Sequence, residues 1–161
     1  MLFRKKAMVL MKKFLTFIFL AINFLLIFSS KTFAVDLPIT SYFGWRIHPI
    51  TGEYKFHSGL DLGYDYGTLV PALFAGTIIM AGDYNNGYGN QVLVYHSDSN
   101  TYTRYAHLQC VYVNIGDYVK QGDYIGEVGS TGYSTGAHLH IEYIVYNGYQ
   151  YEYADPLILW Q

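Results

Sequence analysis

Cysteine is nearly absent from this sequence, and positive charge is scarce in most of it. The 161 residues include one cysteine, Cys110, which excludes an intramolecular disulfide and a cysteine-rich zinc site. Only four of the ten Lys and Arg residues follow residue 34, whereas all 12 Asp and Glu residues do. The resulting net charge of −8 beyond residue 34 argues against a nucleic-acid partner, because nucleic-acid binders carry basic patches.

Helical periodicity is also missing beyond residue 34, where no stretch of ten or more residues shows it. Apolar and polar residues instead largely alternate in 91–96 and 101–106, inside the one long glycine-free window. Such alternation, rich in β-branched and aromatic residues and bounded by turn residues, predicts antiparallel strands. We therefore predict one nearly all-β domain over residues 35–161, a length that suits one domain and not two.

Paired Gly-Asp turns in Val113–Asp123 are similar to the hairpin of biotinyl and lipoyl carrier domains. The similarity implies antiparallel sheets in a flattened barrel-sandwich. A carrier presents a modifiable lysine at a hairpin tip, whereas Lys120 lies inside the turn region. A carrier-type binding module remains an alternative that acylation of Lys120 would reveal.

Residues 1–34 have the layout of a secretory signal. Lys12 and Lys13 precede a 15-residue apolar run, Phe14 to Phe28, and small residues stand at Thr32 and Ala34. The run is shorter than the roughly 20 residues of a spanning helix. We expect cleavage after Ala34, with an uncleaved N-terminal membrane anchor as the alternative. In either case the domain works outside the cytoplasm.

The segment His57-Ser58-Gly59-Leu60-Asp61 carries two potential metal ligands. On a straight strand these residues share a face but lie about 13 Å apart, too far to bind one ion. If both bind one metal, the backbone must bulge near Ser58 and Gly59, which glycine permits. The alternative is a surface turn in which Asp61 caps a backbone amide.

The segment His138-Leu139-His140 places two histidines on one face of a predicted strand. Their Cα atoms would lie about 6.6 Å apart. One imidazole can then bind a metal while the other reaches a water on that metal. Two buried histidines without a shared purpose would each need a separate hydrogen-bond partner, so this spacing favours a function.

Four motifs in order resemble the lysostaphin-type (LytM-domain) zinc metallopeptidases of bacterial cell walls. They are Arg46–Pro49 with Gly52, His57–Gly63, Tyr105–Leu108 and Gly129–Glu142. The resemblance implies that His57, Asp61 and His140 bind one Zn²⁺ and that His107 and His138 are the catalytic histidines. Ala137 and Ile141 stand where many members have Pro and Phe, but neither is a ligand.

The resemblance further implies an active-site groove and hydrolysis of peptide bonds in peptidoglycan stem peptides or cross-bridges. Three protein ligands leave a fourth position for water, as in catalytic zinc sites. The alternative is a non-enzymatic LytM-like domain that binds or activates another cell-wall hydrolase. Tyr54 is a candidate oxyanion-stabilising tyrosine, the spacing assigns His48 no role, and His96 is expected to be structural. We expect the protein in the periplasm or cell wall, touching a membrane only through residues 1–34 if these are uncleaved.

Overall fold

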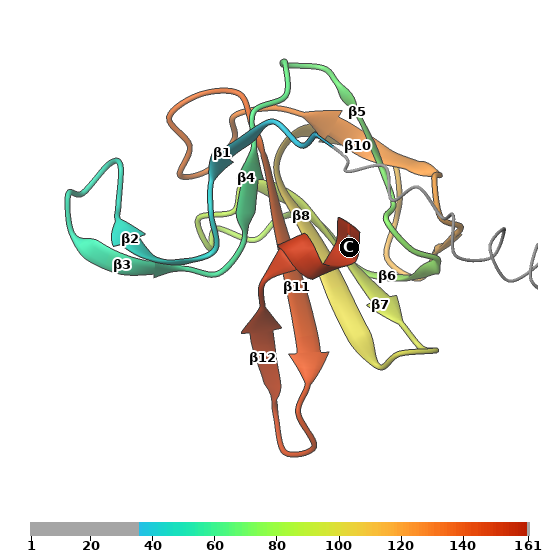
Figure 1. The fold of residues 1–161 in the computed structure, drawn as a ribbon. Helices are drawn as coiled ribbons and strands as arrows, with labels where there is room; N and C mark the ends of the chain where they lie inside the picture. The colour runs from blue at the N-terminus through green and yellow to red at the C-terminus, as the bar shows by residue number, and fades with distance from the viewer. Residues whose placement is uncertain (1–35, 161) are drawn as a thin grey trace, which may run out of the picture. The chain divides into compact units, whose positions relative to one another are not determined.

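A computed structural model of the chain describes residues 36–160 (Figure 1). The predicted signal or anchor, residues 1–34, lies outside the described residues. The elements are β1 (Ile39–Ser41), β2 (Gly44–Ile47), β3 (Tyr54–His57), β4 (Leu60–Leu62), β5 (Leu69–Pro71), β6 (Gly76–Asp83), β7 (Asn90–His96), β8 (Thr101–Val111), β9 (Tyr118–Val119), β10 (Tyr124–Val128), β11 (Leu139–Tyr146), β12 (Tyr151–Ala154) and a 3-10 helix, η1 (Pro156–Trp160). Residues 36–160 contain no α-helix, as the missing periodicity predicts. The short 3-10 helix η1 is not long and apolar enough to cross a membrane.

Ten strands form one sheet in which every pairing is antiparallel, as predicted. The main order is β1-β4-β11-β8-β7-β6-β9, while β12 pairs with β11, and β10 joins β8 to β5. The alternating segments of β7 and β8 pair with each other, so that Val92 lies opposite Tyr105 and Val94 opposite Thr103. The predicted segments therefore pair in a defined register, in which Val92 and Val94 face the core and the first part of β8 alternates between buried and half-buried residues.

Strand β8 changes partner part-way along its length. From Thr101 to Ala106 it pairs with β11, and from Leu108 to Val111 it pairs with β10. His107 lies at the change, with a φ of 61°. The β7–β8 register is irregular at the same place, as in a β-bulge. The bulge lets one long strand serve two parts of the sheet, with β5 and β10 at the top of Figure 1 and β11 running downward.

The core lies between these parts of the sheet and consists of aliphatic side chains with one tyrosine. Its buried members are Leu60, Leu62, Val70, Ala72, Ile78, Val92, Val94, Tyr105, Leu108, Val119, Ile125, Val128, Leu139 and Ile141. Strand β11 sends Leu139 and Ile141 into this core and His140 to its opposite face, as strand alternation requires. The packed core thus fixes the position of the strand that carries His140.

The β2–β3 hairpin is a separate two-stranded sheet beside the main one (Figure 1, left). Arg46 lies directly opposite Lys55, and Gly44 lies opposite His57. Alternation therefore places Arg46, Lys55 and His57 on one face of the hairpin. The hairpin leads straight into the first of the predicted metal ligands.

Candidate metal centre and active site

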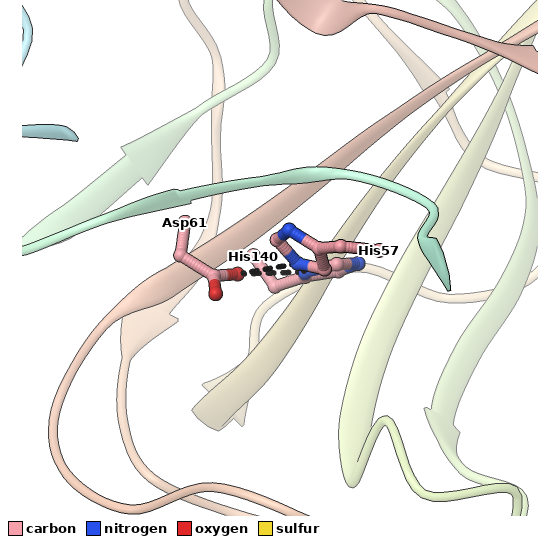
Figure 2. Close-up of side chains that lie close together, drawn as sticks. All are labelled: His57, Asp61 and His140. Atoms are coloured by element: carbon pink, nitrogen blue, oxygen red, sulfur yellow. Dashed lines mark hydrogen bonds and ion pairs between the residues drawn. The ribbon is translucent and has the colours of Figure 1, made fainter. Parts of the chain in front are cut away.

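Three predicted ligands converge on one point, as Figure 2 shows. His57 Nε2 lies 3.1 Å from His140 Nδ1 and 3.2 Å from Asp61 Oδ1. His140 Nδ1 lies 2.8 Å from the same Asp61 oxygen. Tetrahedral ligands at about 2.0–2.1 Å from zinc are about 3.3–3.4 Å apart, so these three atoms have nearly the spacing of a zinc site.

The backbone between His57 and Asp61 bends as their shared role requires. Strand β3 ends at His57, and β4 begins at Leu60 after the two intervening residues. Asp61 then lies directly opposite His140 in the β4–β11 register. A Cβ on Gly59 would come within 2.4 Å of the Ile141 carbonyl oxygen and 2.6 Å of His140 Cε1. Glycine therefore permits the close approach on which the cluster depends.

Hydrogen bonds fix which nitrogen of each imidazole carries a proton. His57 Nδ1 lies 2.8 Å from the carbonyl oxygen of Tyr42, which can only accept, so Nδ1 carries the proton. His140 Nε2 faces Glu142 Oε1 at 3.4 Å and donates by the same reasoning. When both imidazoles are neutral, the lone pairs of His57 Nε2 and His140 Nδ1 consequently face each other beside the Asp61 carboxylate. In the metal-free protein a proton on His140 Nδ1 can bridge to Asp61 Oδ1, and a bound metal ion would take the place of that proton.

Electrostatics within the cluster also favour a cation. Burial alone would raise the pKa of Asp61, but its hydrogen bonds to His140 and His57 hold that pKa well below the usual range. Burial alone would lower the pKa of His140, but hydrogen bonds to Asp61 and Glu142 raise it to about 8. Two nitrogens and one oxygen match the ligand number and types of a catalytic zinc site. The residues therefore fit the implied ion.

Glu142 lies behind His140 and is fully buried. Its Oε1 accepts hydrogen bonds from Ser58 Oγ and Tyr88 Oη, both at 2.5 Å. Its Oε2 is 3.2 Å from Arg104 Nη1, and the Arg104 guanidinium stacks 4.3 Å above the Tyr88 ring. Burial would raise the pKa of Glu142, but His140 and Arg104 hold it below its usual value. This carboxylate orients the His140 ring, a role often played by partners of metal-binding histidines.

The two predicted catalytic histidines lie beside the cluster and line the same cavity. Their ring centroids are 4.7 Å apart. His107 Nδ1 donates to the Thr131 carbonyl at 2.8 Å, and His138 Nδ1 donates to the Gly136 carbonyl at 2.9 Å. In the neutral form of each ring Nε2 is therefore the atom without a proton, and that of His138 lies 3.8 Å from Asp61 Oδ1. Burial lowers the pKa of His107 to about 4, which keeps this imidazole neutral at pH 7.

The sequence did not identify the tyrosine of this cavity. Tyr54 is exposed and stacks on Trp45, with ring centroids 5.3 Å apart, on the hairpin face away from Lys55. Tyr88 and Tyr133 line the cavity instead. Tyr88 lies on a segment distant from the histidine motifs in sequence, so no local pattern marks it, whereas Tyr133 lies within the Gly129–Glu142 motif and could have been considered.

The two remaining histidines have different surroundings. His96 is buried and bonded at both nitrogens, to the Ala75 carbonyl at 2.8 Å and to Thr103 Oγ1 at 2.9 Å, as expected of a structural residue. His48 lines the cavity. Its Nδ1 accepts the backbone amide of Thr51 at 3.2 Å, which leaves the proton on Nε2. His48 therefore contributes an N–H donor.

Comparison with known sequences agrees with this geometry. The profile of Peptidase family M23 matches residues 55–154, which include all five predicted site residues, four histidines and Asp61. The chain belongs to this family. Its members are zinc metallopeptidases, and the antiparallel fold and the metal-binding cluster of this chain are those of such an enzyme.

Three similar proteins place the match in context. The peptidoglycan DD-endopeptidase ShyC of Vibrio cholerae is 46% identical over 101 residues, covering 62% of this chain and 23% of ShyC. The catalytic domain of lysostaphin from Staphylococcus simulans matches with a TM-score of 0.69 and 34% identity, covering 81% of this chain and 97% of that domain. A zinc-containing peptidase from Vibrio cholerae matches with a TM-score of 0.64 and 36% identity, covering 73% and 35%. This chain thus spans under a quarter of ShyC but nearly all of the lysostaphin catalytic domain.

Proposed function

We propose that this chain is an exported zinc endopeptidase that hydrolyses peptide bonds in peptidoglycan stem peptides or cross-bridges. The convergence of His57 Nε2, Asp61 Oδ1 and His140 Nδ1 within 3.2 Å of one another carries the proposal. Membership of family M23 and the similarity to a peptidoglycan DD-endopeptidase support it. Residues 1–34 would direct export to the periplasm or cell wall, as a cleaved signal or as an anchor.

His57, Asp61 and His140 would hold one zinc ion. When bound, zinc supplies a Lewis acid that lowers the pKa of a water molecule towards about 7 and polarises the carbonyl to be attacked. Glu142 keeps His140 in the tautomer whose Nδ1 lone pair faces the ion. The protein thereby presents three ligands in a fixed orientation before the metal arrives.

His107 and His138 would handle the proton. Each donates its Nδ1 proton to a backbone carbonyl and presents an unprotonated Nε2 to the cavity. In that state each can accept a proton from the attacking water, and neither can donate one from Nε2 until it has done so. The imidazolium formed then donates to the leaving amine. His138 lies nearer to the ligand Asp61 and is therefore our choice for the first acceptor.

The role of non-enzymatic activator is the less favoured alternative, because the ligand set and both catalytic histidines are present in one cavity. A single experiment separates the two functions. Zinc content and hydrolysis of purified peptidoglycan are measured for the protein and its variants. We expect one zinc per chain and release of soluble fragments. A protein that binds zinc but releases no fragments would refute the proposed enzyme.

Two variants test the separate assignments. Replacing His140 with Ala should reduce zinc content below half occupancy under dilute chelator. Replacing His138 with Ala should keep zinc and reduce hydrolysis by about 10²–10⁴-fold, the usual contribution of general acid–base catalysis. A third variant, Asp61→Asn, should lose zinc as the His140 variant does. Asp98→Asn is its matched control, because Asp98 lies on the exposed turn between β7 and β8. Full zinc retention by His140→Ala would remove it from the ligand set.

A further inference from the structure

Positive charge in this domain is concentrated at the metal site. Beyond residue 34 the chain has only four cationic side chains, Arg46, Lys55, Arg104 and Lys120. Arg46 and Lys55 both line the cavity that contains the metal cluster. Arg104 forms an ion pair with the buried Glu142. Two of the three other cations of an acidic domain therefore face one cavity.

The hairpin fold explains how both reach it. Arg46 and Lys55 are directly paired across β2 and β3, so their side chains leave the same face as that of His57. Trp45 and Tyr54 occupy the opposite face and stack on each other. The aromatic pair stiffens the hairpin, and the hairpin holds the cations against the site.

The Arg46 guanidinium has unused hydrogen-bonding capacity. Its one ion pair among the described residues is Nη2 to Asp61 Oδ2 at 3.5 Å, longer than the usual 2.7–2.9 Å of such bonds. Its Nε is buried without a hydrogen-bond partner in residues 36–160. Guanidinium presents a planar fork that matches a carboxylate. Arg46 is thus prepared to bind an anion beside the metal site.

The other groups around Arg46 favour an anionic ligand. The Nε2–H of His48 is a further donor in the cavity. Lys55 is paired with Glu53 at 2.7 Å, but both side chains are more than half exposed, so this pair contributes little and can be exchanged. Among the residues that line the cavity, Asp61 is the one carboxylate, and it belongs to the metal-ligand cluster. A cleft lined mainly by one sign of charge attracts the opposite sign.

We propose that Arg46, assisted by His48 and Lys55, binds a carboxylate that the substrate carries next to the scissile peptide bond. The inference rests on the proposed endopeptidase activity and names its substrate class. The Arg46 guanidinium lies 3.5 Å from Asp61, a proposed metal ligand, so a carboxylate bound by Arg46 would lie close to the peptide bond held at the metal. Because consecutive Cα atoms of a peptide are about 3.8 Å apart, that carboxylate belongs to a residue within one or two positions of the scissile bond. The preferred substrate is therefore an anionic cross-linked peptide and not a neutral bridge such as oligoglycine.

The test uses two soluble cross-linked peptides that differ in one group. One has a free carboxylate on the residue that follows the scissile bond, and the other has a carboxamide there. The zinc-loaded full chain should cleave the carboxylate peptide with a kcat/KM about 10- to 100-fold higher, the value of charged hydrogen bonds. Arg46→Gln should bring this ratio close to one, and Arg46→Lys should leave an intermediate ratio. Because both peptides are compared on the same variant, the ratio of their kcat/KM values does not depend on how much zinc that variant holds. A change in zinc binding caused by the contact of Arg46 with Asp61 therefore cancels from the ratio.

Lys55→Gln should reduce the ratio several-fold by raising KM. The matched control, Lys120→Gln, removes a cation that does not line the cavity and should leave the ratio unchanged. Equal cleavage of both peptides by the unmodified protein, or an unchanged ratio in Arg46→Gln, would overturn the inference and leave the endopeptidase proposal intact. Failure to cleave either peptide or peptidoglycan would overturn the proposed function, and the inference with it.

Discussion

Replacing Glu142 with Gln should destabilise the metal-free protein by about 3–5 kcal/mol, the usual cost of removing one partner of a buried ion pair. Glu142 is fully buried, and every polar group around it is a donor: Ser58, Tyr88, Arg104 and His140. A carboxylate can accept from all four. A glutamine offers one accepting oxygen and an NH₂ group that must face another donor.

The size of the effect follows from what the variant leaves unpaired. The Arg104 side chain is only 12% exposed, so its charge would lack a counterion in a largely buried position. The Tyr88 ring below it offers a cation–π contact worth about 0.5–2 kcal/mol, which compensates only in part. Loss of one or two hydrogen bonds to a charged acceptor, at about 1.5–3 kcal/mol each, gives a similar total.

The assay is urea unfolding in the presence of chelator, followed by competitive zinc titration. Because Glu142 orients the ligand His140, zinc affinity should also fall by about 10- to 100-fold. Glu152→Gln is the matched control, since Glu152 is exposed on β12, and it should change stability by less than about 0.5 kcal/mol. An unchanged urea midpoint together with unchanged zinc affinity would refute the proposed role of Glu142.

Three other predictions concern the same site. Gly59→Ala should cost about 1–3 kcal/mol, because its Cβ would overlap the Ile141 carbonyl and the His140 ring, whereas Gly136→Ala, with open space around it, should be neutral in the same urea assay. The stability of the metal-free protein should peak near pH 6.5. Because burial lowers the pKa of His107 to about 4, the unfolded chain takes up this proton first, and the free energy of unfolding should fall by about 3 kcal/mol as pH falls from 6.5 to 4. Because the pKa of His140 is raised to about 8, the folded protein holds this proton longer, and the free energy of unfolding should fall by about 2 kcal/mol as pH rises from 6.5 to 8. Urea midpoints across pH 4–9 check this, and a His107→Gln variant that retains the full acid-side decline would contradict it. Finally, zinc at 100 times its Kd should raise the free energy of unfolding by about 2.7 kcal/mol at pH 7, and Asp61→Asn should lose most of this gain in melting experiments.

The metal ligands were predicted from the resemblance to the lysostaphin-type family, and for His57 and Asp61 the spacing added a local test. His57 and Asp61 would lie about 13 Å apart on a straight strand, so a shared ion demanded a bend at Ser58 and Gly59. The structure has that bend between β3 and β4. The strands β7 and β8 were likewise predictable from the alternation in their sequences, although burial alternates only in the first part of β8 and four consecutive residues of β7 are buried.

The groups that support the ligands could not be predicted, because their contacts join distant parts of the chain. Ser58 and Tyr88 meet Glu142 across 84 and 54 residues. Neither belongs to a spacing pattern with Glu142, and only the completed sheet brings the three together. The candidate Tyr54 lies outside the cavity for a related reason: its place in the sequence does not reveal which hairpin face it occupies. Register, and not sequence distance, decides that Lys55 faces the cavity and Tyr54 does not.

His107 shows how the fold itself directs a proposed catalytic side chain into the cavity. On a regular strand His107 would follow Thr103 and Tyr105, both fully buried on the core side of β8. The bulge shifts the alternation by one residue, so that Leu108 enters the core and His107 lines the cavity beside His138. The cost is a non-glycine residue at a φ of 61°, about 1–3 kcal/mol of strain. Hydrogen bonds from its amide to the Tyr88 carbonyl at 2.9 Å and from its ring to the Thr131 carbonyl offset that cost. The Tyr-x-His motif therefore marks the β-bulge at which regular strand pairing is interrupted, and this interruption directs the His107 imidazole towards the metal site.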